Sequence, residues 1–162
     1  MAVCPYEKIE NEYRAIILNN EVRVAYSKQL PQVIGNGKDT ILKLLAKSNE
    51  KYQINDFDQK IDFYNIPEHN EIFALNWKHN LGIGAVAHIL EEEKTINELS
   101  ILAKKATGLL NLKFASVDII EVNGIYKILE INSGIMMENF ANMNEDNYKL
   151  AKSIYKDAMF EN

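Results

Sequence analysis

The dipeptide Asn123-Gly124 is the feature of the sequence that most constrains the fold. It lies between two apolar runs, residues 117–122 and 126–131. A two-residue hairpin turn requires positive φ at its central positions, which asparagine and glycine adopt at little cost. The two runs are therefore predicted to form an antiparallel β-hairpin, and any fold of this chain has to contain it.

A second hairpin is predicted near the N-terminus. Apart from Arg14, residues 13–18 form an apolar run, Asn19-Asn20 supplies a turn, and Val22, Val24 and Tyr26 then alternate with residues 23, 25 and 27. This alternation is typical of a hairpin with one face in water. Residues 48–70 are polar and have the weakest pattern in the chain, so they are predicted to be irregular or to form a short edge strand.

Three helices are predicted from apolar residues at helical spacing. The first follows Asp39, its expected N-cap. The second begins with a capping box of Thr95 and Glu98 and ends at Gly108. The third has an acidic first turn at residues 145–146, which suits the helix dipole. Their apolar faces consist of Ile41, Leu44 and Leu45; of Leu99, Leu102, Ala103 and Ala106; and of Ala151, Ile154, Tyr155 and Ala158.

The order of these elements predicts an α+β fold, in which an antiparallel sheet built from hairpins has flanking helices. With 3 prolines, 7 glycines and no Pro/Ser-rich linker, residues 1–162 are expected to form a single domain. The net charge of −5, with lysines interleaved among acidic residues, argues against nucleic acid as a partner. Cys4 is the single cysteine, which indicates a reducing, cytoplasmic compartment. No apolar run approaches the ~20 residues of a membrane-spanning helix.

Asp118, Glu130 and Asn132 are polar side chains on the mainly apolar strands of the Asn123-Gly124 hairpin. Burying an unpaired charge is costly, so polar side chains at these positions require either a bound partner or contact with water. Strand alternation places Glu130 and Asn132 on one face, together with Tyr126 and Ile128. Two carboxylates and an amide oxygen on one face would suit Mg²⁺ or Mn²⁺. The alternative is that all three side chains simply face water.

The register of the hairpin separates these two hypotheses. With a regular two-residue turn, Val117 opposes Glu130, and Asp118 then faces away from Glu130. A three-residue loop or a bulge shifts the register by one residue and brings Asp118 and Glu130 to the same face. The metal hypothesis therefore predicts one of these two irregularities.

These residues resemble a known family. Asp118 followed by Glu130-Ile131-Asn132-Ser133-Gly134 resembles the metal-binding Asp and the Glu-x-Asn signature of the ATP-grasp superfamily. This superfamily includes glutathione synthetase, D-alanine–D-alanine ligase and ribosomal-protein glutamate ligases. Residues 11–14 resemble the segment that follows the adenine-binding hinge, and residues 78–84 resemble the loop near the triphosphate. The resemblance covers nearly the whole chain and implies the C-terminal, catalytic part of the fold.

The resemblance also implies how ATP would be held. The backbone at Pro5 and Tyr6 would contact the adenine, and Glu12 would accept hydrogen bonds from the ribose hydroxyls. Lys78 and Asn80 would lie beside the γ-phosphate and the acyl-phosphate. As alternatives that need no ligand, Glu12 could belong to an exposed ion pair with Arg14, and Lys78 could be a solvated loop lysine.

The metal-binding and substrate-binding roles complete the implied site. Asp118, Glu130 and Asn132 would hold Mg²⁺ or Mn²⁺ ions that bridge the ATP phosphates, and Arg14 would orient an anionic substrate. The implied reaction joins a small-molecule or peptide carboxylate to an amine (or a thiol) through an acyl-phosphate. Phosphoryl transfer of this kind depends mainly on positioning and charge neutralisation, so it needs no Ser-His-Asp set.

The chain also departs from the family. The lobe before the hinge is expected to be missing, because too few residues precede Glu12 to build it. Lys78 stands where arginine is common, Ala85 replaces the second glycine of a pair, and Ser116 stands where some peptide ligases place arginine. This chain alone is therefore expected to be incomplete as an enzyme.

Three interpretations remain open from the sequence. The chain is a fragment of an ATP-dependent carboxylate–amine ligase, or a truncated non-catalytic module that binds a nucleotide or a partner, or a plain α+β interaction domain. A lobe that ends at its hinge would expose apolar surface, so self-association is a further hypothesis.

Overall fold

A computed structural model of the protein describes residues 8–48, 52 and 57–160. The chain divides into two compact units. The sheet unit comprises Met1–Lys28 and Ala87–Asn162, and the inserted unit comprises Gln29–Val86. Among the described residues, no helix has the length and apolar character that crossing a membrane would need.

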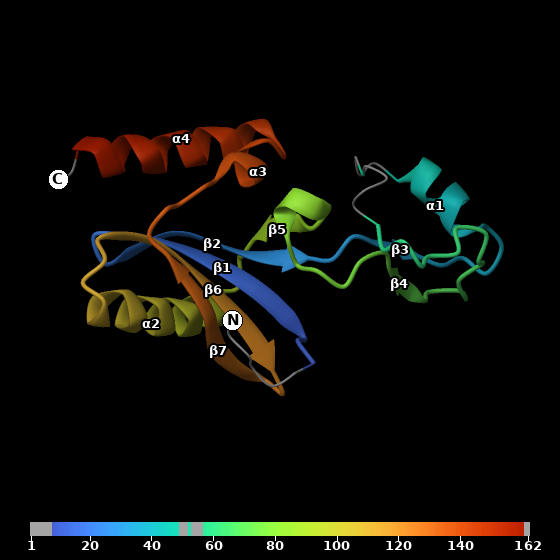
Figure 1. Ribbon diagram of the computed structural model, residues 1–162, viewed down its shortest axis with the longest axis horizontal. Coiled ribbons are helices and arrows are strands. Elements are labelled where there is room, and N and C mark those ends of the chain that lie inside the picture. Colours follow the sequence, from blue (N-terminus) through green and yellow to red (C-terminus); the bar gives the residue numbers. More distant parts are fainter. Residues whose placement is uncertain (1–7, 49–51, 53–56, 161–162) are drawn as a thin grey trace. The chain divides into compact units, whose positions relative to one another are not determined.

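A five-stranded sheet forms the centre of the sheet unit (Figure 1). Its strands are β1 (Asn11–Leu18), β2 (Glu21–Gln29), β5 (Val86–Ile89), β6 (Phe114–Val122) and β7 (Ile125–Asn132), and their order is β5-β2-β1-β6-β7. β1 and β2 form the predicted N-terminal hairpin, and β6 and β7 form the Asn123-Gly124 hairpin. β1 also pairs antiparallel with β6, so the two hairpins join side by side at the centre of the sheet.

The β6–β7 hairpin has a two-residue turn and a bulge. Asn123 and Gly124 have φ values of 52° and 70°, and Val122 pairs with Ile125 across the turn. Further along, Ile119 pairs with Ile128 whereas Asp118 pairs with Glu130, so Leu129 is the extra residue. The structure therefore contains the bulge that the metal hypothesis predicted.

The bulge also corrects one expectation about the faces of β7. Tyr126 makes an edge-to-face contact with Tyr13, and both lie on the face that α2 covers. Ile128 shares that face because it pairs with Ile119. Glu130 lies on the opposite face, because the extra residue interrupts the alternation between positions 128 and 130.

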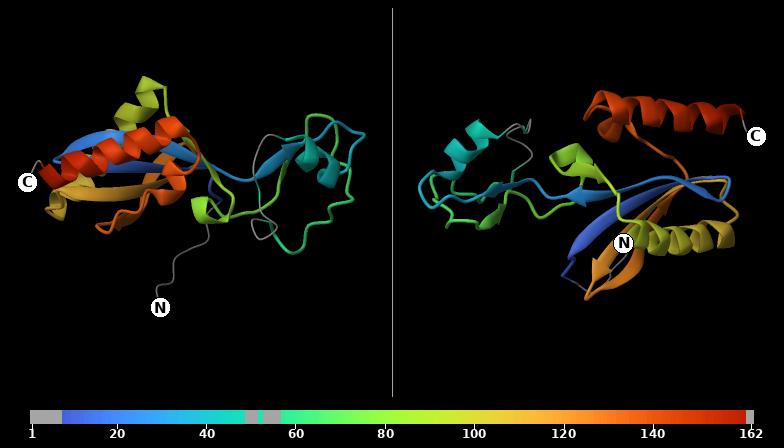
Figure 2. Two further views of the ribbon diagram at one scale, coloured as in Figure 1. Left: turned by 90° about the horizontal axis from the view of Figure 1, so that it is seen from above. Right: turned by 180° about the vertical axis from the view of Figure 1, so that it is seen from behind.

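Helices cover both faces of the sheet (Figure 2). α2 (Glu93–Leu109) packs on one face, and α3 (Glu138–Ala141) and α4 (Glu145–Phe160) pack on the other. The apolar face predicted for α2 is confirmed, since Leu99, Ala103 and Ala106 are buried. The core under α2 consists of Tyr13, Ala15, Ile17, Leu99, Ala103, Val117 and Ile119. In α4, Ala151 and Ile154 are buried as predicted, and the acidic first turn is present.

The ends of α2 differ from the prediction. The helix begins at Glu93, so Thr95 lies inside its first turn and no side chain caps it. The hydroxyl of Thr95 donates instead to a carboxylate oxygen of Glu92. The helix also continues past Gly108 to Leu109, and the left-handed residue after it is Asn111, with φ of 53°. Asparagine tolerates positive φ, so a glycine is not needed there.

The inserted unit has its own small core. It contains β3 (Gln32–Ile34) paired antiparallel with β4 (Ile72–Ala74), α1 (Ile41–Lys47) and a short 3₁₀ helix, η2 (Leu81–Ile83). The buried residues of its core cluster are Val33, Ile41 and Leu75. Where described, residues 48–70 contain no strand, so the irregular alternative of the prediction holds for that part.

The N-cap of α1 is Thr40, not Asp39 as predicted. The backbone at Thr40 is extended, and its hydroxyl accepts a hydrogen bond from the amide of Lys43 at 3.4 Å. Asp39 instead accepts hydrogen bonds from Asn36 and from Lys47, at 2.9 Å and 2.6 Å. Both residue types favour N-caps, and the pattern alone does not decide between neighbouring candidates.

Candidate functional site

Four charged side chains meet on the sheet face opposite α2: Glu12, Arg14, Lys28 and Asp118. We call this set the charged cluster. β1 lies between β2 and β6, with Arg14 directly opposite Tyr26 on one side and Asp118 on the other. Strand alternation then places Glu12 and Lys28 on the same face as Arg14. The cluster therefore follows from the strand order.

Short contacts join the four members. Arg14 donates from Nε to Oδ1 of Asp118 at 2.6 Å and from its terminal nitrogen to Oδ2 at 2.7 Å. The Nζ of Lys28 lies 2.6 Å from Oε1 of Glu12 and 3.1 Å from Oδ1 of Asp118. Two cations thus face two carboxylates, and the forked Arg14 contact has the bidentate geometry of a strong ion pair.

Burial strengthens the interactions between these charges, because little water screens them. The side chains of Lys28 and Asp118 are each 5% exposed. Burial by itself would raise the pKa of Asp118, but the hydrogen bonds from Arg14 and the charge of Lys28 offset this and hold the pKa below its usual range. The hydrogen bond to Asp118 raises the pKa of Arg14. The alternative of an exposed Glu12–Arg14 ion pair is therefore wrong: Glu12 is buried, and each residue has a partner on a neighbouring strand.

Tyr26 lies beside the charged cluster. Its ring stacks on Phe140 of α3, with centroids 4.8 Å apart. Its hydroxyl is enclosed and finds no hydrogen-bond partner in the part of the chain that the structure describes. Burial raises the pKa of Tyr26 to about 12, although the charge of Arg14 opposes this. The cluster is thus enclosed on one side by an aromatic pair.

Glu130 and Asn132 lie next to the cluster on β7. Glu130 is directly opposite Asp118, and Asn132 is directly opposite Ser116. Side chains directly opposite in an antiparallel pair share one face, with Cβ atoms about 5 Å apart. Glu130 is exposed and Asn132 is partly buried. The structure therefore brings the three predicted metal-binding residues together on one sheet face.

The donor set suits a hard cation in part. Asp118, Glu130 and Asn132 offer two carboxylates and an amide oxygen, as Mg²⁺ uses alongside water and phosphate. Within the described residues, no three His, Cys, Asp or Glu side chains gather in a group that could hold a metal. Both oxygens of Asp118 already accept hydrogen bonds from Arg14. The residues fit an ion whose shell is completed by water and phosphate oxygens, not an ion held by protein ligands alone.

The other predicted residues do not belong to the described part of the sheet unit. Lys78 and Asn80 belong to the inserted unit, where both are exposed. The side-chain oxygen of Asn80 accepts a hydrogen bond from the amide of Gly82 at 2.8 Å, and Lys78 Nζ lies 5.3 Å from the Trp77 ring centroid. Gly84 has φ of 88°, which a glycine tolerates at the end of this loop. The predicted adenine contacts, Pro5 and Tyr6, fall outside the described residues.

Lys28 is the member of the cluster that the sequence analysis missed. It lies on the same face of β2 as Val24 and Tyr26, both buried. A lysine in phase with buried residues of a strand is a signal that its ammonium meets a partner inside the protein. The partner could not be identified, because the sequence does not show which strands flank β1.

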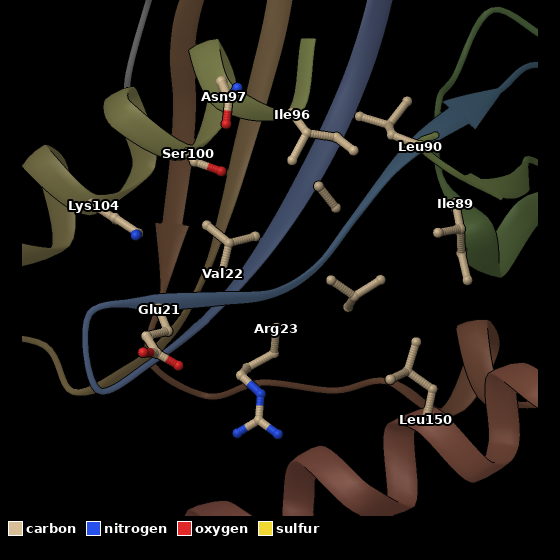
Figure 3. A pocket seen from close by; sticks show the side chains of 12 residues that line it. Glu21, Val22, Arg23, Ile89, Leu90, Ile96, Asn97, Ser100, Lys104 and Leu150 are labelled. Atoms are coloured by element: carbon tan, nitrogen blue, oxygen red, sulfur yellow. The ribbon is translucent and has the colours of Figure 1, made fainter. Parts of the chain in front are cut away.

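A separate pocket of about 510 Å³ opens beside β2 (Figure 3). Its walls come from β2, the end of β5 with the following Leu90, α2 and one residue of α4. Val22, Ile89, Ile96 and Leu150 give it apolar walls, and Arg23 and Lys104 add charge. Arg23 also forms an ion pair with Asp157 of α4. None of the predicted site residues that the structure describes lines this pocket, and neither does Lys28, so the pocket is distinct from the charged cluster.

Comparison with known proteins extends the resemblance seen in the sequence. No family model matches the chain. A tetrahydromethanopterin:α-L-glutamate ligase of Methanocaldococcus jannaschii is 28% identical over 148 residues, covering 76% of this chain and 50% of that protein. The chain therefore spans about half the length of this curated relative.

Two solved structures share the fold. A bifunctional glutathione synthetase from Pasteurella multocida has a TM-score of 0.63 and 15% identity, and the match covers 94% of this chain and 24% of that chain. A D-alanine–D-alanine ligase from Bacillus anthracis has a TM-score of 0.50 and 12% identity, covering 95% and 41%. The resemblance to ATP-grasp ligases predicted from the sequence is confirmed at the level of the fold.

Proposed function

We propose that this chain is the ATP- and Mg²⁺-binding part of an ATP-dependent ligase that joins a carboxylate to an amine (or a thiol) through an acyl-phosphate. One observation carries the proposal: the bulge at Leu129 places Glu130 opposite Asp118, on the face that also holds Glu12 and Asn132. A bulge that exposes a leucine and aligns two carboxylates is the kind of irregularity that occurs next to active sites. The ATP-grasp fold supports the same assignment.

Within this proposal, residues of the charged cluster and of β7 bind different parts of the Mg²⁺–ATP complex. Glu12 accepts hydrogen bonds from the ribose hydroxyls. Asp118, Glu130 and Asn132 would hold Mg²⁺ or Mn²⁺. A bound divalent ion would supply positive charge that offsets the negative charge developing during phosphoryl transfer. Arg14 fixes the position of Asp118 through its two hydrogen bonds. In addition, Arg14 is proposed to orient an anionic substrate.

The inserted unit contributes the second set of proposed residues. Asn80 orders the turn at residues 80–84 by accepting the Gly82 amide, which places Lys78 just before an ordered loop. Lys78 is proposed to neutralise the γ-phosphate, and Asn80 to contact the acyl-phosphate. Pro5 and Tyr6 remain the proposed adenine contacts.

The substrates and partners are proposed at the level of chemical class. They are a small-molecule or peptide carboxylate and an amine, and an N-terminal lobe that completes the pocket. Self-association, a cytoplasmic location and the absence of nucleic acid and membrane partners stay predictions from the sequence.

Calorimetric titration with Mg²⁺ and a non-hydrolysable ATP analogue tests the proposal. Glu130→Gln is the informative variant because Glu130 is exposed, so the fold should tolerate the change. Glu98→Gln is the matched control, since Glu98 is exposed on α2, which covers the opposite sheet face. We expect the wild-type chain and Glu98→Gln to bind equally, and Glu130→Gln to bind at least about tenfold more weakly, a loss of about 1.4 kcal/mol.

The outcomes also separate the alternative of a non-catalytic module. Equal binding by all three proteins would show that Glu130 does not serve the nucleotide, which would remove the metal assignment. A different outcome is that binding depends on Glu130 while no phosphoryl transfer occurs, even when the N-terminal lobe and substrates are present. That result would favour the module that binds a nucleotide without catalysis.

A further inference from the structure

Lys28 contacts two of the carboxylates to which the proposed function gives different ligands. Its Nζ lies 2.6 Å from Oε1 of Glu12, the proposed ribose acceptor, and 3.1 Å from Oδ1 of Asp118, the proposed metal ligand. The Lys28 side chain is 5% exposed, so these contacts replace most of its hydration. The ammonium therefore lies where the proposed function requires ligands to bind.

Geometry makes Lys28 and a metal ion competitors at Asp118. Mg²⁺ binds carboxylate oxygens at about 2.0 to 2.1 Å. An ion at that distance from Oδ1 would stand within a few ångströms of the Lys28 ammonium, and two cations so close repel strongly in a partly buried site. Arg14 also contacts this oxygen, so metal binding there requires one of the two cationic partners, Lys28 or Arg14, to move away.

The two cations of the cluster differ in their freedom to move. Arg14 is fixed by a fork of two hydrogen bonds to Asp118. Lys28 is a point charge at the end of a flexible four-carbon stem, and it makes the longer of the two contacts with Oδ1. Lys28 is the member that can leave Asp118 without breaking the Arg14–Asp118 pair.

We propose that Lys28 is an internal competitor for the metal, which blocks Asp118 until nucleotide phosphates draw its ammonium away. This inference rests on the proposed function. A divalent ion alone binds weakly, because it has to displace the Lys28 ammonium while no phosphate is present to accept it. With the nucleotide present, the phosphate oxygens accept the ammonium, so metal and nucleotide enter together. Lys28 is thus a positioning residue that makes metal binding conditional on the nucleotide.

Titration with Mn²⁺ alone, followed by the electron paramagnetic resonance signal of free Mn²⁺, tests the competition directly. In Lys28→Met, which keeps the apolar stem and removes the charge, we expect the affinity for Mn²⁺ alone to rise at least about tenfold, because a neighbouring unit charge has gone. In the same variant, the affinity for the ATP analogue with Mg²⁺ should fall. Lys28→Arg keeps the charge and should leave Mn²⁺ binding weak.

Two further variants control for charge and folding. Lys105→Met removes one positive charge from the exposed surface of α2 and should leave Mn²⁺ binding unchanged. If Lys28→Met fails to fold, Glu12→Gln/Lys28→Met removes one charge of each sign and keeps the cluster neutral. The double variant should still show a gain in affinity for Mn²⁺ alone, but a smaller one, because the attraction of the Glu12 carboxylate is lost as well.

The two titrations distinguish failure of this inference from failure of the proposed function. An unchanged affinity for Mn²⁺ alone in both Lys28→Met and the double variant would overturn the competition, whatever the nucleotide does. A gain in Mn²⁺ affinity together with nucleotide binding that does not depend on Glu130 would keep the competition and remove the proposed function.

Discussion

Asp118 keeps its charge inside the sheet because Arg14 and Lys28 surround its two oxygens. An ionised carboxylate at this depth would otherwise be unfavourable by several kcal/mol. The contacts therefore stabilise both the fold and the ionised form that a metal ligand needs. Under the proposed function, Asp118 therefore serves both the stability of the fold and metal binding.

Asp118→Asn separates the charge from the shape of the side chain. The amide leaves Arg14 and Lys28 without their shared anion, and we expect the free energy of unfolding to fall by about 2 to 3 kcal/mol at neutral pH, because solvent screens part of the Arg14 charge. The pKa of Asp118 in the folded state lies below its usual value of 3.8. Its contribution is therefore complete above about pH 4 and is lost as the pH falls through the folded-state pKa.

Urea unfolding of wild type and Asp118→Asn at a series of pH values measures this. The difference between the two proteins should be constant from about pH 7 to pH 4 and should shrink at lower pH. A difference that stays the same down to about pH 2 would show that the ionised carboxylate is not the source of the stability.

The sequence identifies Asp118 as a residue in need of a partner, but not the partner itself. Arg14 and Lys28 are distant from Asp118 along the chain, and they reach it because β1 lies between β2 and β6. A hairpin pattern predicts pairing within a hairpin only. Contacts between hairpins depend on the sheet order, which local patterns do not contain.

At the scale of elements, the β6–β7 hairpin combines a regular turn with an irregular strand. The turn was predictable because only a few residues adopt its φ values. The bulge was predictable only as a condition of the metal hypothesis, since no residue in the sequence marks Leu129 as the extra position. Its half-exposed leucine shows that alignment of Glu130 with Asp118 is accompanied by exposure of apolar surface.

Two glycine substitutions test how strongly the turn fixes this hairpin. Gly124 has φ of +70°, and nothing lies within 4 Å of an added Cβ, so alanine there meets no steric clash with its neighbours. Gly124→Ala should nevertheless destabilise the protein by about 1 to 2 kcal/mol, because a left-handed backbone is unfavourable for a residue with a Cβ. Gly108→Ala should stabilise the protein by about 0.5 to 1 kcal/mol, since Gly108 lies within α2 in equally open space.

Thermal or urea unfolding of both variants gives the comparison. The two substitutions add the same methyl group to open surface, so a difference of sign isolates the backbone conformation. If Gly124→Ala proved as stable as wild type, the hairpin would owe its register to the strands and not to the turn.

At the scale of the molecule, each of the two units has a hydrophobic core of its own among the described residues. Leu99 belongs to the core of the sheet unit, and Leu75 to that of the inserted unit. The helical and hairpin patterns predicted the first core closely. The second was poorly predicted, because the inserted unit is built mostly from irregular segments whose burial follows no period.

Cavity variants should show whether the two cores are separate units of stability. Leu99 and Leu75 are fully buried, and Leu99→Ala and Leu75→Ala should each destabilise their own unit by about 3 kcal/mol. Hydrogen exchange should then speed up in β1, β6 and α2 for Leu99→Ala, and in β3, β4 and α1 for Leu75→Ala.

Ile101→Ala is the matched control, because Ile101 is on α2 but 70% exposed, and it should change exchange little. Faster exchange throughout the chain in both core variants would show that the two units unfold as one.

The neighbouring positions of β2 and β5 have a consequence for how this chain can be rebuilt. The amide of Leu90 donates to the carbonyl of Ala25, so β2 and β5 are the two arms of one hairpin whose loop is a folded unit. Adjacent arms stand about 4.8 Å apart, a gap that a two-residue turn can bridge. The inserted unit is therefore an exchangeable cassette: excising it should leave the strand order of the sheet intact, and the same two arms offer a graft point for a different module.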